Sequence, residues 1–411
     1  MKLLMKVLML VPDNQMIDRR VLQQAKTLVE AGYSVTLLAG FECQIEEHYT
    51  WRNVDIHRYK FDWNDERLNK IRKNLYGNVR LYNIVKKIFM KFVKPVLKLS
   101  PYDNFILSRA RQFKSDIVHV HDLPLLHHGS VLAKEWKTPL VFDSHEIYYM
   151  QGNLPEKFRK QFEMEEKQYL PTTNLFITVN DAIADFYIRK YDQHPLVLLN
   201  AADTPPVGFN NDSRKALSEL AGVSGDSFLI LYQGWFSPER NLPTLIRTAE
   251  YLPTNAYVLM LGYGKYEEEL RRILSNQPWA EKVKFLGTIE QEKMLFFTAG
   301  ANLGIIPYLP VDLNHELCSP NKFFEFVQAG VPVLAHDLVF FRNMAERFGV
   351  VSVSDLSSVE SMAAAMNSLI TDQTHLLKMR TACQMAAKEL NWEVEGKKLI
   401  TAYSKLINLD H

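Results

Sequence analysis

Histidine and carboxylate side chains follow two predicted strands of this 411-residue chain, the apolar runs Ile117–Val120 and Leu140–Phe142. They are His121 and Asp122 after the first strand, and His145 and Glu146 after the second. Polar residues just beyond strand ends are where an open α/β sheet places its chemistry. Histidine beside carboxylate can indicate a metal site, but no HExxH or other tight ligand spacing occurs. We therefore predict a polar site that holds no metal.

The stretch Ser319–Ala335 predicts a loop, a short helix and a buried strand in quick succession. Ser319 is a typical helix cap, Pro320 suits the first helical position, and Gly330 ends the helix. Free N–H groups at such a helix start, next to Lys322, offer a site for an anion. The polar face of the helix consists of Asn321, Lys322, Glu325 and Gln328. On spacing alone, a solvated face explains this pattern at least as well as an anion site does.

Length and composition indicate an ordinary globular protein with room for two domains. Hydrophobic residues make up 47% and charged residues 23% of the chain, and the net charge of +1 gives no case for binding nucleic acid. The three cysteines, Cys43, Cys318 and Cys383, lie too far apart for a disulfide framework or a zinc motif, which predicts a reduced, cytoplasmic protein. No segment has the roughly 18 uninterrupted apolar residues of a membrane span.

Alternating strands and helices predict parallel sheets and an α/β fold. The strand Val7–Val11, a helix from about Asp18 to Ala31 and the strand Ser34–Ala39 form a βαβ unit, in which the absence of GxGxxG argues against a dinucleotide cofactor. The second half repeats the rhythm, with predicted strands Phe228–Tyr232, Tyr257–Leu261, Val283–Leu286, Leu303–Ile306 and Val331–Ala335. We predict doubly wound domains at 1–200 and 201–390, and a C-terminal helix within 391–411 that packs back toward the first domain. Two such domains facing each other imply a cleft built from both sets of strand ends.

The segment Arg67–Lys98 is strongly basic inside a nearly neutral chain. It holds ten Lys or Arg and no Asp or Glu, and apolar residues repeat at helical spacing from Leu81 onward. This pattern is typical of a helix on an anionic membrane surface. A helix that packs in the core with a solvated lysine face has the same pattern, so both interpretations stay open.

Six motifs in order along the chain resemble the retaining glycosyltransferases of family 4, which have the GT-B fold of two facing Rossmann-like domains. The motifs are Asp18-Arg-Arg-Val, Asp116-Ile-Val-His-Val-His-Asp with Phe142-Asp-Ser-His-Glu, Gly234 through Arg240-Asn241, Leu261-Gly-Tyr-Gly, Phe285-Leu-Gly-Thr-Ile, and the stretch Ser319–Ala335. The resemblance implies transfer of a sugar from a nucleotide-diphosphate sugar to a glycan or lipid-linked acceptor, with retention at the anomeric carbon. It further implies metal-independent chemistry without a cofactor, in surface polysaccharide or glycolipid assembly, by a cytoplasmic enzyme at the inner face of the plasma membrane.

The resemblance also implies roles for individual residues. His121 would lie beside the transferred sugar, Arg240 would bind the diphosphate in place of the family's lysine, and Glu325 would bind the ribose hydroxyls; these are the expected catalytic residues. The remaining nucleotide-sugar-binding residues would be Gly234, Gly262, Gly264, Thr288, Ile289, Ser319, Pro320, Asn321 and Lys322. The acceptor side would consist of Asp18, Arg19, Asp122, His145 and Glu146.

Two positions depart from the family pattern. Leu317 stands where the family has its first acidic residue, next to Glu316, and Trp235 stands where it has a basic residue. These departures motivate an alternative, a GT-B protein that binds a nucleotide sugar with little turnover. A second alternative keeps the fold and changes the reaction to that of a nucleotide-sugar epimerase.

Overall fold

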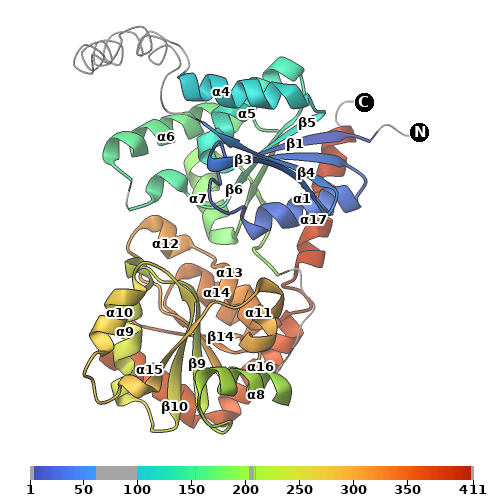
Figure 1. The fold of residues 1–411 in the computed structure, drawn as a ribbon. Coiled ribbons are helices and arrows are strands. Elements are labelled where there is room, and N and C mark those ends of the chain that lie inside the picture. The colour runs from blue at the N-terminus through green and yellow to red at the C-terminus, as the bar shows by residue number, and fades with distance from the viewer. Residues whose placement is uncertain (1–3, 62–99, 153, 203–207, 209, 409–411) are drawn as a thin grey trace, which may run out of the picture. The chain divides into compact units, whose positions relative to one another are not determined.

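The computed structural model describes residues 4–61, 100–152, 154–202, 208 and 210–408 (Figure 1). The chain forms two compact units. The first consists of Met1–His145, Lys157–Ile177 and Ile400–His411, and the second of Glu146–Glu156 and Thr178–Leu399. Each unit is discontinuous in sequence, and the domain boundaries predicted after residues 200 and 390 stay predictions. The basic segment Arg67–Lys98 lies outside the described residues.

The first sheet has eight strands in the order β3-β4-β2-β1-β5-β6-β7-β8. Its strands are β1 (Lys6–Val11), β2 (Ser34–Ala39), β3 (Glu42–Trp51), β4 (Val54–Lys60), β5 (Ile117–His121), β6 (Leu140–Ser144), β7 (Leu175–Thr178) and β8 (Leu196–Val197). Strand β1 pairs in parallel with β2 and β5, and β6 extends the parallel run beyond β5. Because the carboxyl ends of parallel strands meet at one edge, the polar residues after β5 and β6 are brought together.

The helices around the first sheet are α1 (Arg19–Glu30), α4 (Pro101–Ala110), α5 (Leu126–Trp136), α6 (Glu156–Tyr169) and α7 (Asp181–Tyr191). Helix α1 buries an apolar stripe that includes Val21, Ala25 and Leu28, at the spacing of one helix face. The Asp18 side chain caps this helix by accepting a hydrogen bond from the Arg20 N–H at 2.7 Å. The cap therefore fixes the first turn of α1, where Arg20 lies.

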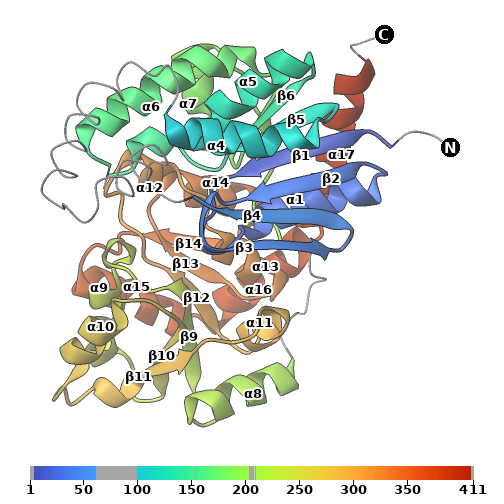
Figure 2. The ribbon, with the colours of Figure 1, turned by 45° about the horizontal axis from the view of Figure 1, so that its top comes forward.

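The hairpin of β3 and β4 is an element that sequence reasoning missed. The two strands pair antiparallel at one edge of the sheet (Figure 2). Most of β3 is exposed, and its sequence lacks the apolar run by which the neighbouring buried strands were recognised. A solvated edge strand gives only a weak hydrophobic pattern, which explains the omission.

The second sheet has six strands in the order β11-β10-β9-β12-β13-β14. Its strands are β9 (Phe228–Trp235), β10 (Ala256–Tyr263), β11 (Val283–Gly287), β12 (Leu303–Ile306), β13 (Val333–His336) and β14 (Val351–Ser354). The helices of this half are α8 (Asn211–Ala221), α9 (Leu242–Arg247), α10 (Glu267–Leu274), α11 (Gln291–Thr298), α12 (Leu313–Leu317), α13 (Asn321–Gln328), α14 (Val339–Phe348), α15 (Val359–Thr371) and α16 (Gln373–Ala386). The last helix, α17 (Trp392–Asn408), begins in the second unit, and its residues from Ile400 onward belong to the first. All the strand pairs of this sheet are parallel.

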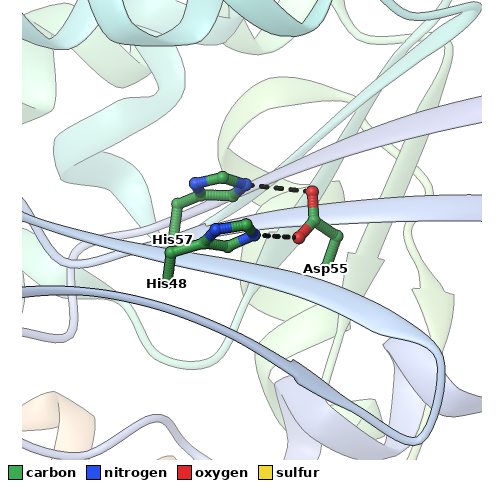
Figure 3. A group of neighbouring side chains, drawn as sticks. All are labelled: His48, Asp55 and His57. Atoms are coloured by element: carbon green, nitrogen blue, oxygen red, sulfur yellow. Dashed lines mark hydrogen bonds and ion pairs between the residues drawn. The ribbon is translucent and has the colours of Figure 1, made fainter.

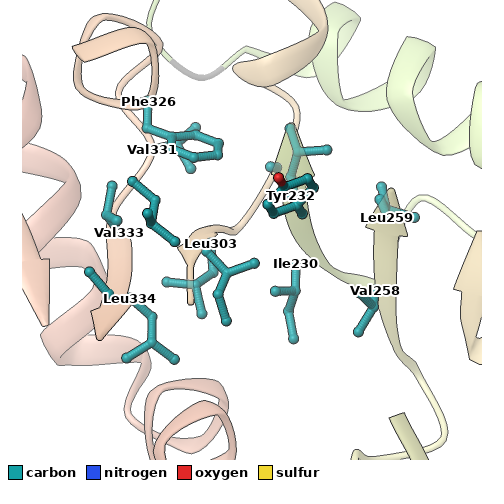
Figure 4. Packing of buried hydrophobic residues seen from close by; sticks show 14 of the residues in the cluster. Ile230, Tyr232, Val258, Leu259, Leu303, Phe326, Val331, Val333 and Leu334 are labelled. Atoms are coloured by element: carbon teal, nitrogen blue, oxygen red, sulfur yellow. The ribbon is translucent and has the colours of Figure 1, made fainter. Parts of the chain in front are cut away.

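A continuous apolar core surrounds the second sheet. Figure 4 shows Ile230 and Tyr232 of β9 beside Leu303 of β12, with Phe326 of α13 over them. Phe326 is fully buried, so helix α13 is anchored to the sheet by its apolar face. Its polar face, which includes Glu325, is thereby fixed in orientation at the strand ends.

The observed sheets confirm the predicted α/β fold with two Rossmann-like sheets. Strands Ser34–Ala39 and Leu303–Ile306 have the predicted bounds. Within the described parts of the chain, no helix combines the length and the apolar character that crossing a membrane requires.

Candidate active site

In the first unit, polar side chains converge on the carboxylate of Asp143. The register of β5 and β6 places His121 directly opposite Asp143. Arg20 donates to both carboxylate oxygens, from Nη2 to Oδ1 at 2.9 Å and from Nε to Oδ2 at 3.0 Å. Gln24, one turn further along α1, donates to Oδ2 at 2.5 Å, and His145 Nε2 lies 3.1 Å from the same oxygen. Asp143 thus joins α1, β5 and the segment after β6 in one network.

The ion pair of Arg20 and Asp143 is shielded from solvent, with exposed side-chain fractions of 3% and 0%. Burial acts to raise the pKa of Asp143, but the Arg20 charge, together with His145, outweighs it and holds that pKa well below its ordinary value. Asp143 is therefore an ionised, fully paired carboxylate that orients the histidines around it.

His121 is completely buried and has one nitrogen in the network and one outside it. Its Nδ1 lies 3.3 Å from His145 Nε2 and 3.4 Å from Asp143 Oδ2. Its Nε2 has no hydrogen-bond partner in the part of the chain that the structure describes. Burial lowers the pKa of His121, so the imidazole is mainly neutral near pH 7. Nε2 is therefore the atom that a ligand hydroxyl can meet.

Asp122 has a strained backbone just after β5, with φ 61° and ψ 155°. Its carboxylate accepts a hydrogen bond from the His145 backbone N–H at 3.1 Å and lies 3.2 Å from His145 Nδ1. Backbone strain of this kind persists where surrounding contacts enforce it, and it concentrates at functional sites. The strained turn holds His145 between the carboxylates of Asp122 and Asp143.

The pKa of His145 makes this network sensitive to pH. Burial acts to lower the pKa, but the Asp122 and Asp143 carboxylates outweigh it and raise the pKa well above 6.5. Protonated His145 therefore stabilises the folded state. This contribution is complete below the unfolded-state pKa of about 6.5, and it is lost as the pH rises through the folded-state pKa. We expect the Tm of the wild type to fall more steeply above pH 7 than the Tm of His145→Gln, measured by calorimetry. Parallel pH profiles would contradict a charged His145.

His119, His121 and Asp143 also have ligand atoms within 4.8 Å of one another, a spacing that a metal ion could use. The Arg20 guanidinium already neutralises Asp143 at 2.9 Å and would be repelled by a second cation there. The His119 Nδ1 is bonded to the Tyr403 hydroxyl at 2.7 Å. The donor set therefore fits a hydrogen-bonded network better than a metal centre, and metal independence stays a prediction.

In the second unit, two cationic side chains lie over aromatic rings. Lys322 Nζ lies 4.0 Å from the ring centre of Tyr232 and 5.0 Å from that of Tyr308. The Arg240 guanidinium lies 4.1 Å from the ring centre of Tyr308. Both cations therefore contact the Tyr308 ring, and together they concentrate positive charge beside it.

Lys322 is 92% buried, since only 8% of it is exposed, and its Nζ has no hydrogen-bond partner among the described residues. Burial and the nearby Arg240 charge hold the pKa of Lys322 well below its ordinary value. A buried ammonium without a bonded anion is costly for a protein to maintain. Lys322 therefore marks a position prepared for a negatively charged ligand.

Glu325 is held in place by a chain of hydrogen bonds across three elements. Gln233 of β9 donates to Glu325 Oε2 at 2.6 Å, and the Thr298 hydroxyl of α11 lies 2.9 Å from Gln233 Oε1. Because a carboxylate only accepts hydrogen bonds, the amide nitrogen of Gln233 faces Glu325, and the amide oxygen faces Thr298. The carboxylate is positioned before any ligand arrives, as a binding residue requires.

The start of α13 differs from the prediction in one respect. The predicted Ser319 cap is wrong, because Pro320 occupies the cap position and no side chain caps the helix. Ser319 is buried, its carbonyl accepts a hydrogen bond from Asn200 at 3.1 Å, and its Oγ has no partner in the described chain. The first N–H groups of α13, near Asn321, are consequently without a side-chain cap.

The glycines after β9 and β10 allow two loops to approach closely. Gly234 has φ 121° and Gly262 has φ 148°, and the strand register pairs them. A Cβ on Gly262 would lie 1.9 Å from the Gly234 carbonyl oxygen, and a Cβ on Gly234 would lie 2.9 Å from Lys322 Nζ. Gly264 is equally crowded by the Phe236 backbone. Side chains here would displace both the loops and the lysine.

The remaining predicted residues lie at the start of α1 and in segments that follow strands. Thr288 is exposed and Ile289 half-buried between β11 and α11. Arg19 begins α1 directly after the Asp18 cap. Glu146 belongs to the second unit, where its carboxylate accepts hydrogen bonds from Gln151 and Asn314.

The departures from the family pattern have structural explanations. Leu317 is buried, and its carbonyl accepts a hydrogen bond from Asn180 at 2.8 Å, whereas Glu316 is exposed. Trp235 is 47% exposed and meets Tyr263 edge to face, with ring centres 5.0 Å apart. Neither position supplies the charge that the family places there.

Arg20 and Asp143 belong to motifs that the sequence analysis identified, but no role was predicted for either. Sequence reasoning missed four further residues of the two groups: Gln24, Tyr232, Gln233 and Tyr308. The sequence of α1 does indicate that Arg20 and Gln24 are buried. Arg20, Gln24 and the buried Leu28 follow one another at intervals of four residues, so all three lie on one helix face. Polar residues on the apolar face of a helix indicate a buried polar network. For Tyr232, Gln233 and Tyr308 no comparable signal exists, because strand ends and loops bring them together.

Two family models match most of the chain. The model described as "Glycosyltransferase Family 4" matches residues 17–204, and the model described as "Glycosyl transferases group 1" matches residues 213–390. A D-inositol 3-phosphate glycosyltransferase of Xylanimonas cellulosilytica is 21% identical over 313 residues, which are 71% of this chain and 72% of that protein.

Solved structures resemble the chain over nearly its whole length. Sucrose-phosphate synthase from Thermosynechococcus elongatus has a TM-score of 0.73 at 14% identity, covering 98% of this chain and 100% of that one. Anabaena HepE in complex with UDP gives the same TM-score of 0.73, identity of 14% and coverage of 98% and 100%. At these identities the likeness concerns the fold, and it agrees with the two observed Rossmann-like sheets.

Proposed function

Since the chain belongs to the family 4, group 1 type of glycosyltransferases with the two-domain GT-B fold, we propose that it transfers a sugar from a nucleotide-diphosphate sugar to an acceptor hydroxyl with retention at the anomeric carbon. The acceptor in this proposal is a glycan or a lipid-linked sugar of surface polysaccharide or glycolipid assembly. Binding of UDP by the similar HepE structure supports a nucleotide donor.

The observation that carries the proposal is the pair of cations on Tyr308, the buried Lys322 at the uncapped start of α13 and the half-buried Arg240. A departing nucleoside diphosphate gains charge on its phosphate oxygens, and preorganised cations and N–H groups stabilise that charge. Glu325, whose carboxylate accepts a hydrogen bond from Gln233, is proposed to accept further hydrogen bonds from ribose hydroxyls. The backbone near Thr288 and Ile289 is proposed to bind the base.

In the reaction, the bond from the anomeric carbon to the β-phosphate oxygen breaks and a bond from that carbon to the acceptor oxygen forms. The electron pair of the broken bond leaves with the diphosphate, which can accept the proton of the acceptor hydroxyl. In the first unit, His121 Nε2 is proposed to bind a hydroxyl of the transferred sugar, because it is the unbonded nitrogen of a neutral imidazole. Asp143 and His145 position that ring. Asp18, Arg19 and Asp122 are proposed to lie on the acceptor side. Glu146 was predicted to lie on the same side.

Trp235 and Leu317 keep one alternative open, a protein that binds the donor without efficient transfer, since both positions lack the expected charge. Lys322 offers a physical answer for the first position, because its ammonium occupies the space beside Gly234. Lys322 of α13 would thus supply the positive charge at the diphosphate that Trp235 cannot supply.

The test is an assay of purified protein with a panel of UDP-, GDP- and ADP-sugars, with and without a membrane extract as acceptor. We expect release of one nucleoside diphosphate that depends on the acceptor, with the sugar found in the product in the donor's anomeric configuration. Isomerised donor without acceptor would identify an epimerase. Nucleotide binding without any transfer would favour the binding protein.

The basic segment Arg67–Lys98 motivates a peripheral position at the cytoplasmic face of the membrane, where anionic lipids attract lysine-rich segments. We expect the wild type to float with anionic vesicles, and a variant with Lys87, Lys91 and Lys94 changed to Glu to stay in the soluble fraction. Equal flotation of both proteins would show that this segment does not bind the membrane.

A further inference from the structure

The edge hairpin of the first sheet brings together two histidines and an aspartate that the proposed glycosyl transfer does not use. His48 of β3 and His57 of β4 are cross-strand partners, and their rings stack with centres 4.1 Å apart and planes 10° apart. Asp55 lies two residues before His57, so the side chains of both point to the same face of the strand. Figure 3 shows both rings directed at the Asp55 carboxylate.

The nitrogen and oxygen atoms of the group converge. His48 Nε2 lies 2.7 Å from Asp55 Oδ1, and His57 Nε2 lies 2.9 Å from Oδ2. One ligand atom from each residue can be chosen so that all lie within 4.8 Å of one another. From this convergence we propose that His48, Asp55 and His57 bind a divalent transition metal of the Zn²⁺ type, with the remaining coordination position open to water.

The donor set matches such an ion. Two imidazoles and one carboxylate are preferred ligands of Zn²⁺, and a site with three protein ligands keeps an open position. Bonds of about 2.0–2.1 Å in a tetrahedral site set the ligand atoms about 3.3 Å apart. The stacked rings direct their Nε2 lone pairs in nearly parallel directions, so binding requires the exposed His48 ring to rotate until both lone pairs face one ion.

The surroundings fix one ligand and leave access to the other. The His57 ring packs against Phe113, with centres 4.6 Å apart, and only 14% of its side chain is exposed. His48 is 63% exposed, so an ion can enter from solvent. The Asp55 side chain is 41% exposed, so the ion can reach the carboxylate from solvent as well.

The cationic residue next to His57 in the sequence is directed away from the three proposed ligands. Arg58, which follows His57 and so belongs to the other face of β4, donates to the backbone carbonyls of Asn14 and Gln15 at 2.9 and 3.1 Å. Its charge is used to hold the loop after β1. A bound ion would join β3 to β4 and so stabilise the edge of the sheet.

The test uses the full chain without a histidine tag, freed of metal by chelator and titrated with Zn²⁺ by calorimetry near pH 7.5. We expect one site in the wild type, with affinity at least about tenfold weaker in His48→Gln, His57→Gln and Asp55→Asn, since even loss of supporting contacts weakens metal sites about 10–100-fold. His194→Gln, an exposed histidine elsewhere, is the matched control and should bind as the wild type does. Because metal must displace protons, the affinity should fall as the pH is lowered.

A second readout identifies the ligands directly. Cu²⁺ bound to the wild type should give an electron paramagnetic resonance spectrum with coupling to two imidazole nitrogens, and to one in His48→Gln. His48 is largely exposed, so this variant is expected to fold, as circular dichroism can verify. The proposal is overturned if the wild type binds no Zn²⁺, or if the hairpin variants bind it as tightly as the wild type. Glycosyl transfer plays no part in either measurement.

Discussion

Replacing Arg240 by methionine is expected to lower kcat/KM about 10²–10³-fold, equivalent to about 2.7–4 kcal/mol of transition-state stabilisation, the effect of removing one preorganised donor at developing charge. Arg240 lies over Tyr308 beside Lys322. Methionine keeps the contact with the ring and removes only the charge and the N–H donors. The loss should therefore appear in transfer rather than in folding.

Arg247→Met is the matched control for Arg240→Met, because Arg247 is exposed at the end of α9 in the same unit. We expect its kcat/KM to equal that of the wild type, with unchanged Tm for both variants. Wild-type transfer by Arg240→Met would remove Arg240 from the diphosphate site.

Replacing Arg20 by methionine is expected to lower the free energy of unfolding of the first unit by about 3–5 kcal/mol, because it leaves the Asp143 carboxylate buried without its cation. The loss of the bidentate contact also removes what fixes Asp143 against His121 and His145. Denaturant unfolding followed by circular dichroism measures the effect as a lower midpoint for the unfolding of the first unit.

Lys26→Met provides the control on the same helix, since the half-buried Lys26 lies 3.8 Å from the exposed Glu30 at the helix surface. A change below about 0.5 kcal/mol is expected there. Adding Asp143→Leu to Arg20→Met should recover part of the stability, because the unpaired charge is then removed as well. Equal stability of Arg20→Met and Lys26→Met would mean that the pair contributes nothing.

Periodic patterns in the sequence predict most of the buried strands of this fold, although β14 was missed and β13 begins two residues later than predicted. Buried parallel strands such as Leu303–Ile306 are short apolar runs, and helices such as Glu267–Leu274 have clear amphipathic spacing. The edge hairpin could not be predicted in the same way, because a solvated strand such as Glu42–Trp51 carries no apolar run. Elements that contact water on most sides have only a weak hydrophobic pattern in the sequence.

For the candidate site, the sequence indicates charged residues at strand ends and helix starts, such as His121 and Lys322. It does not indicate which neutral residues hold them, because Gln233 and Tyr308 join the site through tertiary contacts. The predicted Ser319 cap shows the same limit. Local preference favours a serine cap, while burial of the side chain and the Asn200 contact decide the actual conformation.

The central claim is that Lys322, Arg240 and the start of α13 bind a nucleoside diphosphate. Calorimetric titration of UDP, GDP and ADP into the wild type and Lys322→Met tests it directly, with Lys284→Met, a half-buried lysine paired with the exposed Glu281, as control. We predict that one of these nucleotides binds to the wild type and to Lys284→Met with equal affinity, and at least about tenfold more weakly to Lys322→Met. Binding of none of them to the wild type, or equal binding to Lys322→Met, would contradict the claim.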